Sequence, residues 1–219
     1  MHIVSVNVGQ PREIRLNDRL VLTSIFKQPV EGRVPVRNHN LQGDRQADLR
    51  VHGGPYKAVY AYSSEHYPYW AEDLGVELAW GNFGENLTTV DLTEESTFIG
   101  DQFRVGSAVL QVTQPRMPCF KLNLRFGRSD IVKRFWRCGF SGIYFSIIEE
   151  GELAAGDQLQ LVHRVPNGIS VADVVRVYKG EIDDEQVFQL ALKAPLRGSW
   201  KEEIQERRAE RTLPLFTKP

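Results

Sequence analysis

Short runs of strand-type residues, separated by turn residues, fill the first two thirds of this chain and constrain its fold most. The runs are rich in Val, Ile, Phe and Tyr, and they read IVSVNV, GRVPVRN, KAVYAYS, DQFRVGSAVLQVTQ, GIYFSIIEE and DQLQLVHR. Many short strands separated by Gly, Asp, Asn and Pro favour a barrel-like or mixed β-fold over a doubly wound sheet. No G-x-G-x-x-G or P-loop motif points to the alternative. The sequence therefore predicts a mainly β protein with flanking helices.

Two short helical patterns interrupt the strands, at residues 63–75 and 129–139. Each has a serine near its start as a candidate N-cap and a glycine as its stop: Ser63 or Ser64 with Gly75, and Ser129 with Gly139. Both predicted helices are short enough to lie across one end of a barrel.

The pattern changes after Pro166-Asn167-Gly168. Three helical segments follow, SVADVVRVYKG, DDEQVFQLALKA and GSWKEEIQERRAER, and Gly180 and the Pro195 to Gly198 turn divide them. We therefore predict a β-domain at residues 1–165 and a small three-helix module with a tail at residues 166–219. Because so small a module is marginal as an isolated fold, we expect it to dock on the β-domain or on a second subunit.

The overall charge and the cysteine count limit the classes of partner. With 27 basic and 28 acidic residues the net charge is −1, so neither nucleic acid nor an anionic membrane is an expected partner. No long apolar run or charged leader indicates a membrane span or signal peptide, and the expected compartment is the cytoplasm. The chain has only Cys119 and Cys138, at a spacing typical of neither zinc fingers nor redox motifs, so two free thiols are expected.

The stretch QPRMPCFKL, residues 114–122, places Cys119 directly after a predicted strand. Neighbouring cations lower the pKa of a thiol, so Arg116 and Lys121 favour the thiolate, which is the reactive and metal-ligating form. The residues alone leave three interpretations of Cys119 open: a buried inert cysteine, a nucleophile or a ligand to a metal.

Two glycine-containing loops supply further candidates. In VHGGPYKAVYAY, the backbone N–H groups of Gly53 and Gly54 together with Lys57 could hold an anion, and His52 precedes them. In WGNFGENLTT, residues 84–86 form a polar tip suited to gripping a ring edge or a phosphate. Each loop taken singly is equally an ordinary turn.

The histidines have no metal-ligand spacing, and two cysteines cannot build a four-thiolate or iron–sulfur site. A metal would thus arrive in a cofactor that brings its own ligands, with Cys119 as the ligand from the protein.

Six segments, taken in order, resemble the MOSC domain family, which is named for the C-terminal domain of molybdenum cofactor sulfurase. They are IFKQPV, LQGDRQADLRVHGGPYKAVYAY, HYPYWAEDLG, GNFGENLTT, GDQFRVGSAVLQVTQPRMPCFKL and GIYFSIIEEG. The resemblance is to the bacterial YiiM-type subfamily, which is linked to 6-hydroxylaminopurine resistance. It covers roughly residues 1–165, and the helices that follow resemble the appendage of that subfamily.

The resemblance implies a barrel-like MOSC domain that holds molybdenum cofactor, molybdopterin with molybdenum, and in which Cys119 ligates the metal. It implies contacts to the cofactor phosphate or pterin from Lys57, Arg116 and Lys121, and proton delivery or positioning by His52. The remaining residues that match motifs near the cofactor pocket are Gly53, Gly54, Gly84, Glu85 and Asn86.

The implied reaction is a detoxifying two-electron reduction of an N-hydroxylated base, such as 6-hydroxylaminopurine, to its amine, with release of water. Because the chain has no flavin or nicotinamide motif, a separate flavoprotein or iron–sulfur reductase is expected to donate the electrons. A homodimer is a reasonable arrangement. Two alternatives stay open: a non-catalytic carrier of molybdenum cofactor or of sulfur, and a thiol hydrolase that pairs Cys119 with a histidine base.

Overall fold

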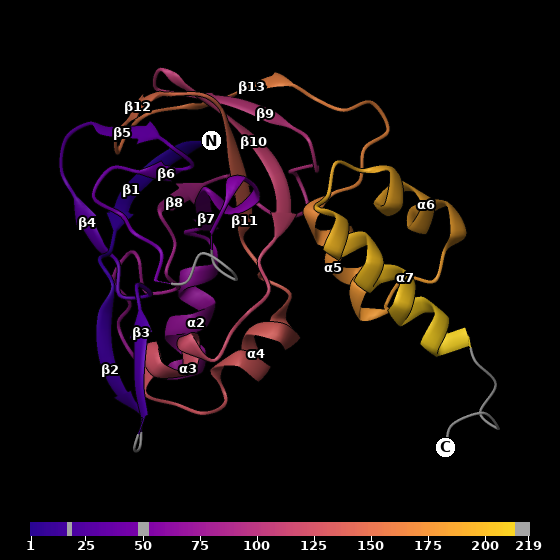
Figure 1. Ribbon diagram of the computed structural model, residues 1–219, viewed down its shortest axis with the longest axis horizontal. Helices are drawn as coiled ribbons and strands as arrows, with labels where there is room; N and C mark the ends of the chain where they lie inside the picture. Colours follow the sequence, from indigo (N-terminus) through magenta and orange to yellow (C-terminus); the bar gives the residue numbers. More distant parts are fainter. Residues whose placement is uncertain (17–18, 48–52, 213–219) are drawn as a thin grey trace.

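One eight-stranded sheet forms the body of the protein. In this computed structural model, which describes residues 1–16, 19–47 and 53–212, the strand order is β13-β9-β10-β11-β7-β8-β1-β4 (Figure 1). The strands are β1 (His2–Val8), β4 (Gln28–Val30), β7 (Val59–Ser63), β8 (Leu87–Val90), β9 (Gln102–Val105), β10 (Ala108–Pro115), β11 (Ile143–Glu149) and β13 (Leu159–His163). All neighbours pair antiparallel except β7 and β8, which are parallel.

The sheet curls back on itself. A bridge joins His2 to Gln158, and Leu159 donates its N–H to the Met1 carbonyl oxygen at 3.2 Å, so the chain entering β13 lies against β1. The side chains inside this curl form a buried apolar core that includes Val6, Leu110 and Phe145. The predicted barrel-like, mainly β architecture with flanking helices is confirmed.

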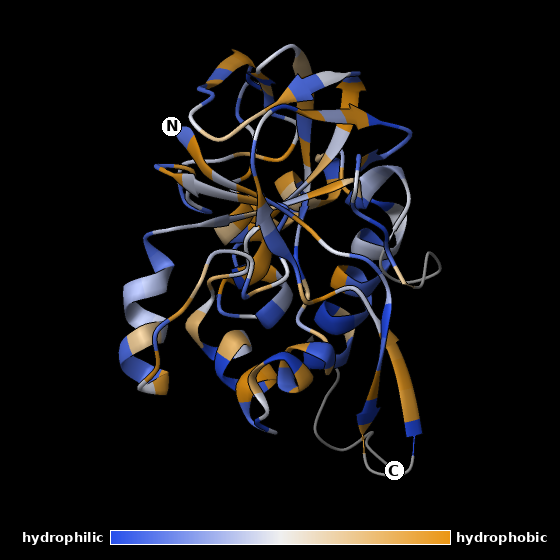
Figure 2. Cartoon of the chain, turned by 90° about the vertical axis from the view of Figure 1, so that its left-hand side faces the viewer, coloured by the Kyte–Doolittle hydropathy of each residue, from blue (hydrophilic) through white to orange (hydrophobic). Residues whose placement is uncertain are grey.

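Two smaller sheets flank the barrel. Strands β5 (Val34–Arg37), β6 (Asn40–Leu41) and β12 (Gly151–Leu153) form one, and β2 (Arg12–Leu16) pairs with β3 (Arg19–Thr23) to form a hairpin. Figure 2 shows this hairpin projecting from the body with β3 largely apolar, and Leu20 and Leu22 are exposed there.

Three helices cover one end of the barrel (Figure 1): α2 (His66–Leu74), α3 (Lys121–Phe126) and α4 (Ile131–Cys138), while the 3-10 turn η1 (Pro55–Lys57) precedes β7. The glycine stops are confirmed, since Gly75 and Gly139 are left-handed C-caps. The predicted serine N-caps are wrong: Glu65 and Asp130 occupy those positions, and Ser63 belongs to β7, whose pairing with β8 extends it.

The C-terminal module consists of α5 (Val171–Lys179), α6 (Glu185–Lys193) and α7 (Gly198–Thr212), and Figure 1 shows it beside β10 and β11. It docks on the β-domain, which was one of the two predicted arrangements. Val171 donates its N–H to the Thr97 oxygen at 2.9 Å, and Ala172 to the Glu94 oxygen at 3.0 Å. Val174 and Val177 belong to the same buried cluster as the barrel core. The division at residues 165/166 stays a prediction. In the described part of the chain, no helix has both the length and the apolar character needed to span a membrane.

Candidate functional site

Cys119 lies in the loop between β10 and α3, where two clefts share a wall. The first cleft has a volume of about 560 Å³ and the second about 800 Å³, and both open to solvent. Lys57, Cys119 and Tyr144 line both. The side chain of Cys119 is half-buried. The thiol is therefore accessible at the junction of two separate binding spaces.

The pairing of β10 with β11 sets this junction. Gln114 lies opposite Tyr144, so these two side chains come from adjacent strands. The hydroxyl of Thr113 donates to the backbone oxygens of Tyr56 at 2.7 Å and Tyr144 at 3.0 Å. These hydrogen bonds hold η1, and with it Lys57, beside the ends of the two strands that lead to Cys119.

Three predicted cations line the first cleft: Lys57, Arg116 and Lys121. Arg116 is buried; its Nη1 donates to the Phe83 carbonyl oxygen, and its guanidinium carbon lies 4.6 Å from the centroid of the Tyr60 ring. Burial lowers the pKa of Lys57, and the positive charge of Arg197 lowers it further. The cleft wall beside Cys119 thus presents fixed positive charge, which suits an anionic group.

A buried polar network forms another part of the first cleft. Lys27 Nζ lies 2.5 Å from Asp44 Oδ1, and Asn86 Nδ2 donates to Asp44 Oδ2 at 3.0 Å. The Asn86 Oδ1 accepts the N–H of Tyr60 at 3.1 Å, so Asn86 joins this network to β7. Charged side chains in loops are usually exposed to solvent. Lys27 and Asp44 are instead buried and paired with each other.

Glu85 is not among the residues that line the two clefts, and its predicted contact with the cofactor stays a prediction that its hydrogen bonds do not favour. Its side chain is 0% exposed, and it accepts hydrogen bonds from Tyr67 Oη, Gly81 N at 2.8 Å, Phe83 N at 3.0 Å and Thr88 Oγ1 at 3.0 Å. Burial raises the pKa of Glu85, and these donors oppose the increase. Because its carboxylate is occupied by the loop around it, Glu85 shapes the tip.

The predicted glycines differ in position. Gly84 lines the first cleft with φ 76°, and a Cβ there would meet Ile25 Cγ1 at 2.9 Å, so only glycine fits. Gly53 and Gly54 lie just before η1 and are not among the residues that line the two clefts, so their predicted contact with the cofactor stays a prediction. The predicted His52 lies outside the described residues.

Sequence reasoning missed two buried oxygens that have no hydrogen-bond partner, Ser24 Oγ in the first cleft and Gln114 Oε1 in the second. It also missed the contribution of the C-terminal module to the second cleft. The remaining lining residues that it did not single out include Gln46, Tyr144, Ser199, Trp200 and Glu203. Of these residues, only Gln114 could have been found from the sequence, because it is the first residue of the stretch that contains Cys119.

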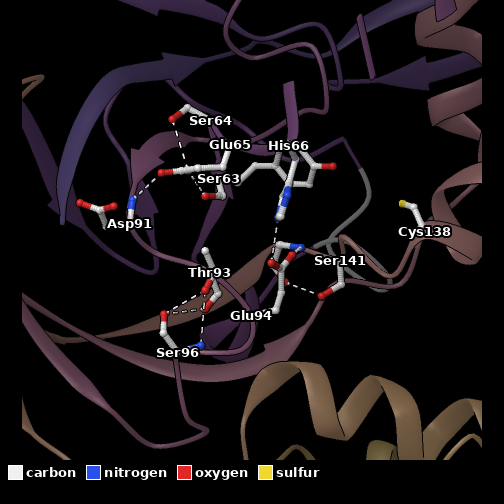
Figure 3. Close-up of polar contacts among 12 residues, drawn as sticks. Ser63, Ser64, Glu65, His66, Asp91, Thr93, Glu94, Ser96, Cys138 and Ser141 are labelled. Atoms are coloured by element: carbon white, nitrogen blue, oxygen red, sulfur yellow. Dashed lines mark hydrogen bonds and ion pairs between the residues drawn. The ribbon is translucent and has the colours of Figure 1, made fainter. Parts of the chain in front are cut away.

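A second polar cluster lies under α2 and serves the fold (Figure 3). His66 Nε2 lies 2.8 Å from Glu94 Oε2, and Gly142 N donates to Glu94 Oε1 at 2.6 Å. The imidazole stacks on the Phe140 ring with centroids 4.0 Å apart. His66 and Glu94 are buried, and no histidine of the described ranges lines either cleft.

Cys138 occupies a different environment from Cys119. Its thiol donates to the Phe135 oxygen at 3.3 Å, and burial raises the pKa of the Cys138 thiol to about 11. Cys138 therefore stays protonated at neutral pH. Within residues 1–16, 19–47 and 53–212, no group of three or more His, Cys, Asp or Glu side chains could hold a metal ion.

Comparison with known proteins decides the family. Residues 48–160 match the MOSC domain. YflK of Bacillus subtilis (strain 168) is 40% identical over 97% of this chain and 96% of its own length. This chain belongs to the MOSC domain family. Within that family, YiiM of Escherichia coli (strain K12) is 38% identical over 90% of this chain and 89% of its own length.

A solved structure and a longer relative complete the comparison. YiiM from Geobacillus stearothermophilus superposes with a TM-score of 0.78 at 37% identity, covering 94% of this chain and 98% of the other, so this MOSC protein is of the YiiM type. A protein of Gibberella moniliformis named "Reductase" is 34% identical over 81% of this chain, which spans 32% of its length. The matched MOSC stretch contains Lys57, Arg116 and Cys119, whereas α5, α6 and α7 lie beyond it.

Proposed function

We propose that this MOSC protein is a molybdenum-cofactor-dependent reductase that converts N-hydroxylated bases such as 6-hydroxylaminopurine to their amines. The observation that carries the proposal is the position of Cys119, on the wall common to a cleft lined with cations and a second, separate cleft. This arrangement would let a cofactor held by Cys119 in the first cleft meet a substrate that enters from the adjoining second cleft.

The residues of the first cleft fit a molybdopterin. Lys57, Arg116 and Lys121 supply positive charge for its phosphate, and Asn86 and Gln46 supply polar groups to the same cleft. Cys119 would supply a soft thiolate, which suits molybdenum better than a carboxylate does. When bound, the molybdenum centre supplies the two electrons and takes up the oxygen.

The balanced reaction is R–NHOH plus two electrons and two protons giving R–NH₂ and water, so the N–O bond breaks and the nitrogen is reduced. Lys57 Nζ is the described group best placed to give a proton, because it borders both clefts and burial lowers its pKa. Arg116 is held by the Phe83 oxygen, so its charge needs no reorganisation when an anion binds. The electrons come from a separate flavoprotein or iron–sulfur reductase.

The comparisons support this reading at the level of the family and of one relative named as a reductase. No described histidine is placed to serve as a base for Cys119, so the geometry favours the hydrolase alternative less.

The test measures molybdenum and pterin in the protein purified from a host that makes molybdenum cofactor. The wild type is expected to carry near-stoichiometric amounts of both, and Cys119→Ser to lose the metal. Cys138→Ser is the matched control, because Cys138 lies at the end of α4 and lines neither cleft, so its loss should leave the metal in place.

Activity with a chemical electron donor then separates enzyme from carrier. A loaded wild type that reduces 6-hydroxylaminopurine supports the reductase. A loaded protein that reduces nothing indicates a carrier of cofactor. Folded wild type without molybdenum or pterin in a cofactor-replete host contradicts the proposal.

A further inference from the structure

The second cleft lies between the barrel and the C-terminal module, and the proposed cofactor contacts use only part of its wall. From the barrel it is lined by Gln114, Met117 and Pro118, in addition to the three residues that it shares with the first cleft. From the module it is lined by Arg197, Ser199, Trp200 and Glu203. A ligand in this cleft would touch both parts of the chain.

Gln114 has a buried amide oxygen that forms no hydrogen bond within the described residues. It is 2% exposed and lines the cleft, while its Oε1 is buried from solvent and has no hydrogen-bond partner among the described residues. Its neighbour on the same strand, Gln111, is by contrast satisfied, since its Oε1 accepts from Gln102 Nε2 at 3.2 Å. A buried amide oxygen left unpaired costs stability, and a ligand N–H would recover that cost once the amide turns its oxygen toward the cleft.

The module side of the cleft is an ordered surface. Trp200 is 6% exposed and packs against Tyr178 with ring centroids 5.1 Å apart, and Tyr178 Oη donates to Glu203 Oε2 at 2.8 Å. Positions 199, 200 and 203 lie on one face of α7 because three and four residues complete a helical turn. Glu203 therefore presents a carboxylate held in place by Tyr178.

The chemistry of the wall fits a flat heterocycle with N–H groups on its edge. Trp200, Met117, Pro118 and Tyr144 offer apolar and aromatic surface for a ring. The Gln114 amide and the Glu203 carboxylate are two of the polar groups that line the same cleft.

We infer that the second cleft is the substrate site of the proposed reductase, that it takes a purine-type base, and that the Gln114 amide and Glu203 on α7 read the N–H edge of that base. This inference rests on the proposed function. It assigns the C-terminal module a direct part in substrate choice. The ring lies between the barrel and α7, and its N-hydroxylated amino group faces the wall that holds Cys119 and Lys57.

The charges around Lys57 agree with this placement. Burial and Arg197 lower the pKa of Lys57, whereas Cys119 and Glu203 raise it. Lys57 in η1, Cys119 in the loop before α3 and Glu203 in α7 thus interact electrostatically across the second cleft.

The test uses the protein as purified and the variants Gln114→Leu and Glu203→Gln, with Gln111→Leu as the matched control on the same strand. Titration calorimetry measures the binding of adenine, the product of 6-hydroxylaminopurine reduction. The Kd for adenine is expected to rise by about tenfold in each of the two cleft variants and to stay within about twofold in the control. Glu203 is exposed on α7, so Glu203→Gln keeps the test valid if Gln114→Leu fails to fold.

Steady-state kinetics with the loaded protein provide a second readout. The KM for 6-hydroxylaminopurine should rise by about tenfold in the cleft variants, whereas the KM for hydroxylamine, which has no ring, should change by less than about twofold. Molybdenum content should stay at the wild-type level, because neither residue lines the first cleft.

Failure of the inference is distinguishable from failure of the proposed function. If the wild type reduces 6-hydroxylaminopurine and both variants bind and reduce as it does, the assignment of this cleft is overturned and the function stands. Absence of adenine binding by the wild type at about millimolar concentration also overturns it. If the wild type reduces nothing but adenine binding is lost in the variants, the function falls and the cleft remains a heterocycle site.

Discussion

Lys27 Nζ and Asp44 Oδ1 lie 2.5 Å apart in a buried ion pair on the wall of the first cleft. Burial lowers the pKa of Lys27 below its ordinary 10.5, and the charge of Asp44 opposes this effect. We predict that Asp44→Asn lowers the free energy of unfolding by about 3–5 kcal/mol, because it leaves a buried ammonium without its counter-charge. Urea denaturation measures the change.

The pH dependence of this variant follows from the sign of the shift. The pKa of Lys27 is lower in the folded protein than in the unfolded chain, where it is 10.5. At a pH between the two values, the lysine is protonated in the unfolded chain but not in the folded protein. The free energy of unfolding therefore rises with pH across this window. The window reaches lower pH in Asp44→Asn, so its deficit should shrink as pH rises from neutral toward 10.5. The double variant Lys27→Met with Asp44→Asn should recover most of the loss, and a deficit as large as that of the single variant would contradict the explanation.

Glu85→Gln should destabilise the loop behind the first cleft. The amide NH₂ of a glutamine would face donors such as Gly81 N and Phe83 N, so we predict a loss of about 1–3 kcal/mol in the free energy of unfolding. Since burial raises the folded pKa of Glu85 above 4.5, the wild type loses stability as pH rises through this region, and the variant lacks that loss. The gap between wild type and variant should therefore be wider at about pH 4.5 than at about pH 7. A gap that widens with pH would refute the assignment.

Gly142→Ala should be more costly than Gly127→Ala. Both glycines have left-handed φ angles, 67° and 64°, but a Cβ at Gly142 would lie 2.5 Å from Tyr60 Oη whereas nothing lies within 4 Å at Gly127. We predict about 1–2 kcal/mol of destabilisation at Gly127 from the backbone alone and about 1–3 kcal/mol more at Gly142 from overpacking. Thermal or urea unfolding of the two variants measures the difference, and equal costs would show that the contact with Tyr60 is easily relieved.

Val174→Ala should lower the stability of the whole chain rather than of the helical module alone. Val174 is 0% exposed and packs in the same cluster as the barrel core. We predict a loss of about 2 kcal/mol in a single transition seen alike by circular dichroism and tryptophan fluorescence. Val162→Ala, at a site that is 50% exposed, is the matched control and should change stability by less than about 0.5 kcal/mol. Two separate transitions would show that residues 166–219 unfold as an independent unit.

Lys121→Gln should weaken cofactor retention without unfolding the protein. Lys121 lines the first cleft at the start of α3 and is only half-buried. Loss of one cation facing a phosphate predicts about a tenfold lower pterin content after dialysis, with stability unchanged within about 0.5 kcal/mol. Lys133→Gln, on the exposed face of α4, is the control and should retain the wild-type content. Equal retention in both variants would remove Lys121 from the set of cofactor contacts.

The strands were predictable because their signal is local. Alternating β-branched and aromatic residues between turn residues indicate strands whatever the rest of the chain does, and glycines such as Gly75 and Gly139 end helices for a backbone reason that needs no partner. The helix starts were less predictable, since the strand pairing of Ser63 outweighed its tendency to cap. The turn into α3 gave too short a pattern to be recognised.

The sequence by itself thus determined the strand-rich class and the family, and it singled out Cys119 as the candidate ligand. The tertiary structure decided which polar groups are buried: it turned Glu85 inward, paired Lys27 with Asp44, and left Gln114 Oε1 without a partner. It also brought α7 to the cleft that borders Cys119. These outcomes depend on contacts between residues far apart in the chain, and no local pattern records whether a polar side chain will meet solvent, a partner or an open cleft.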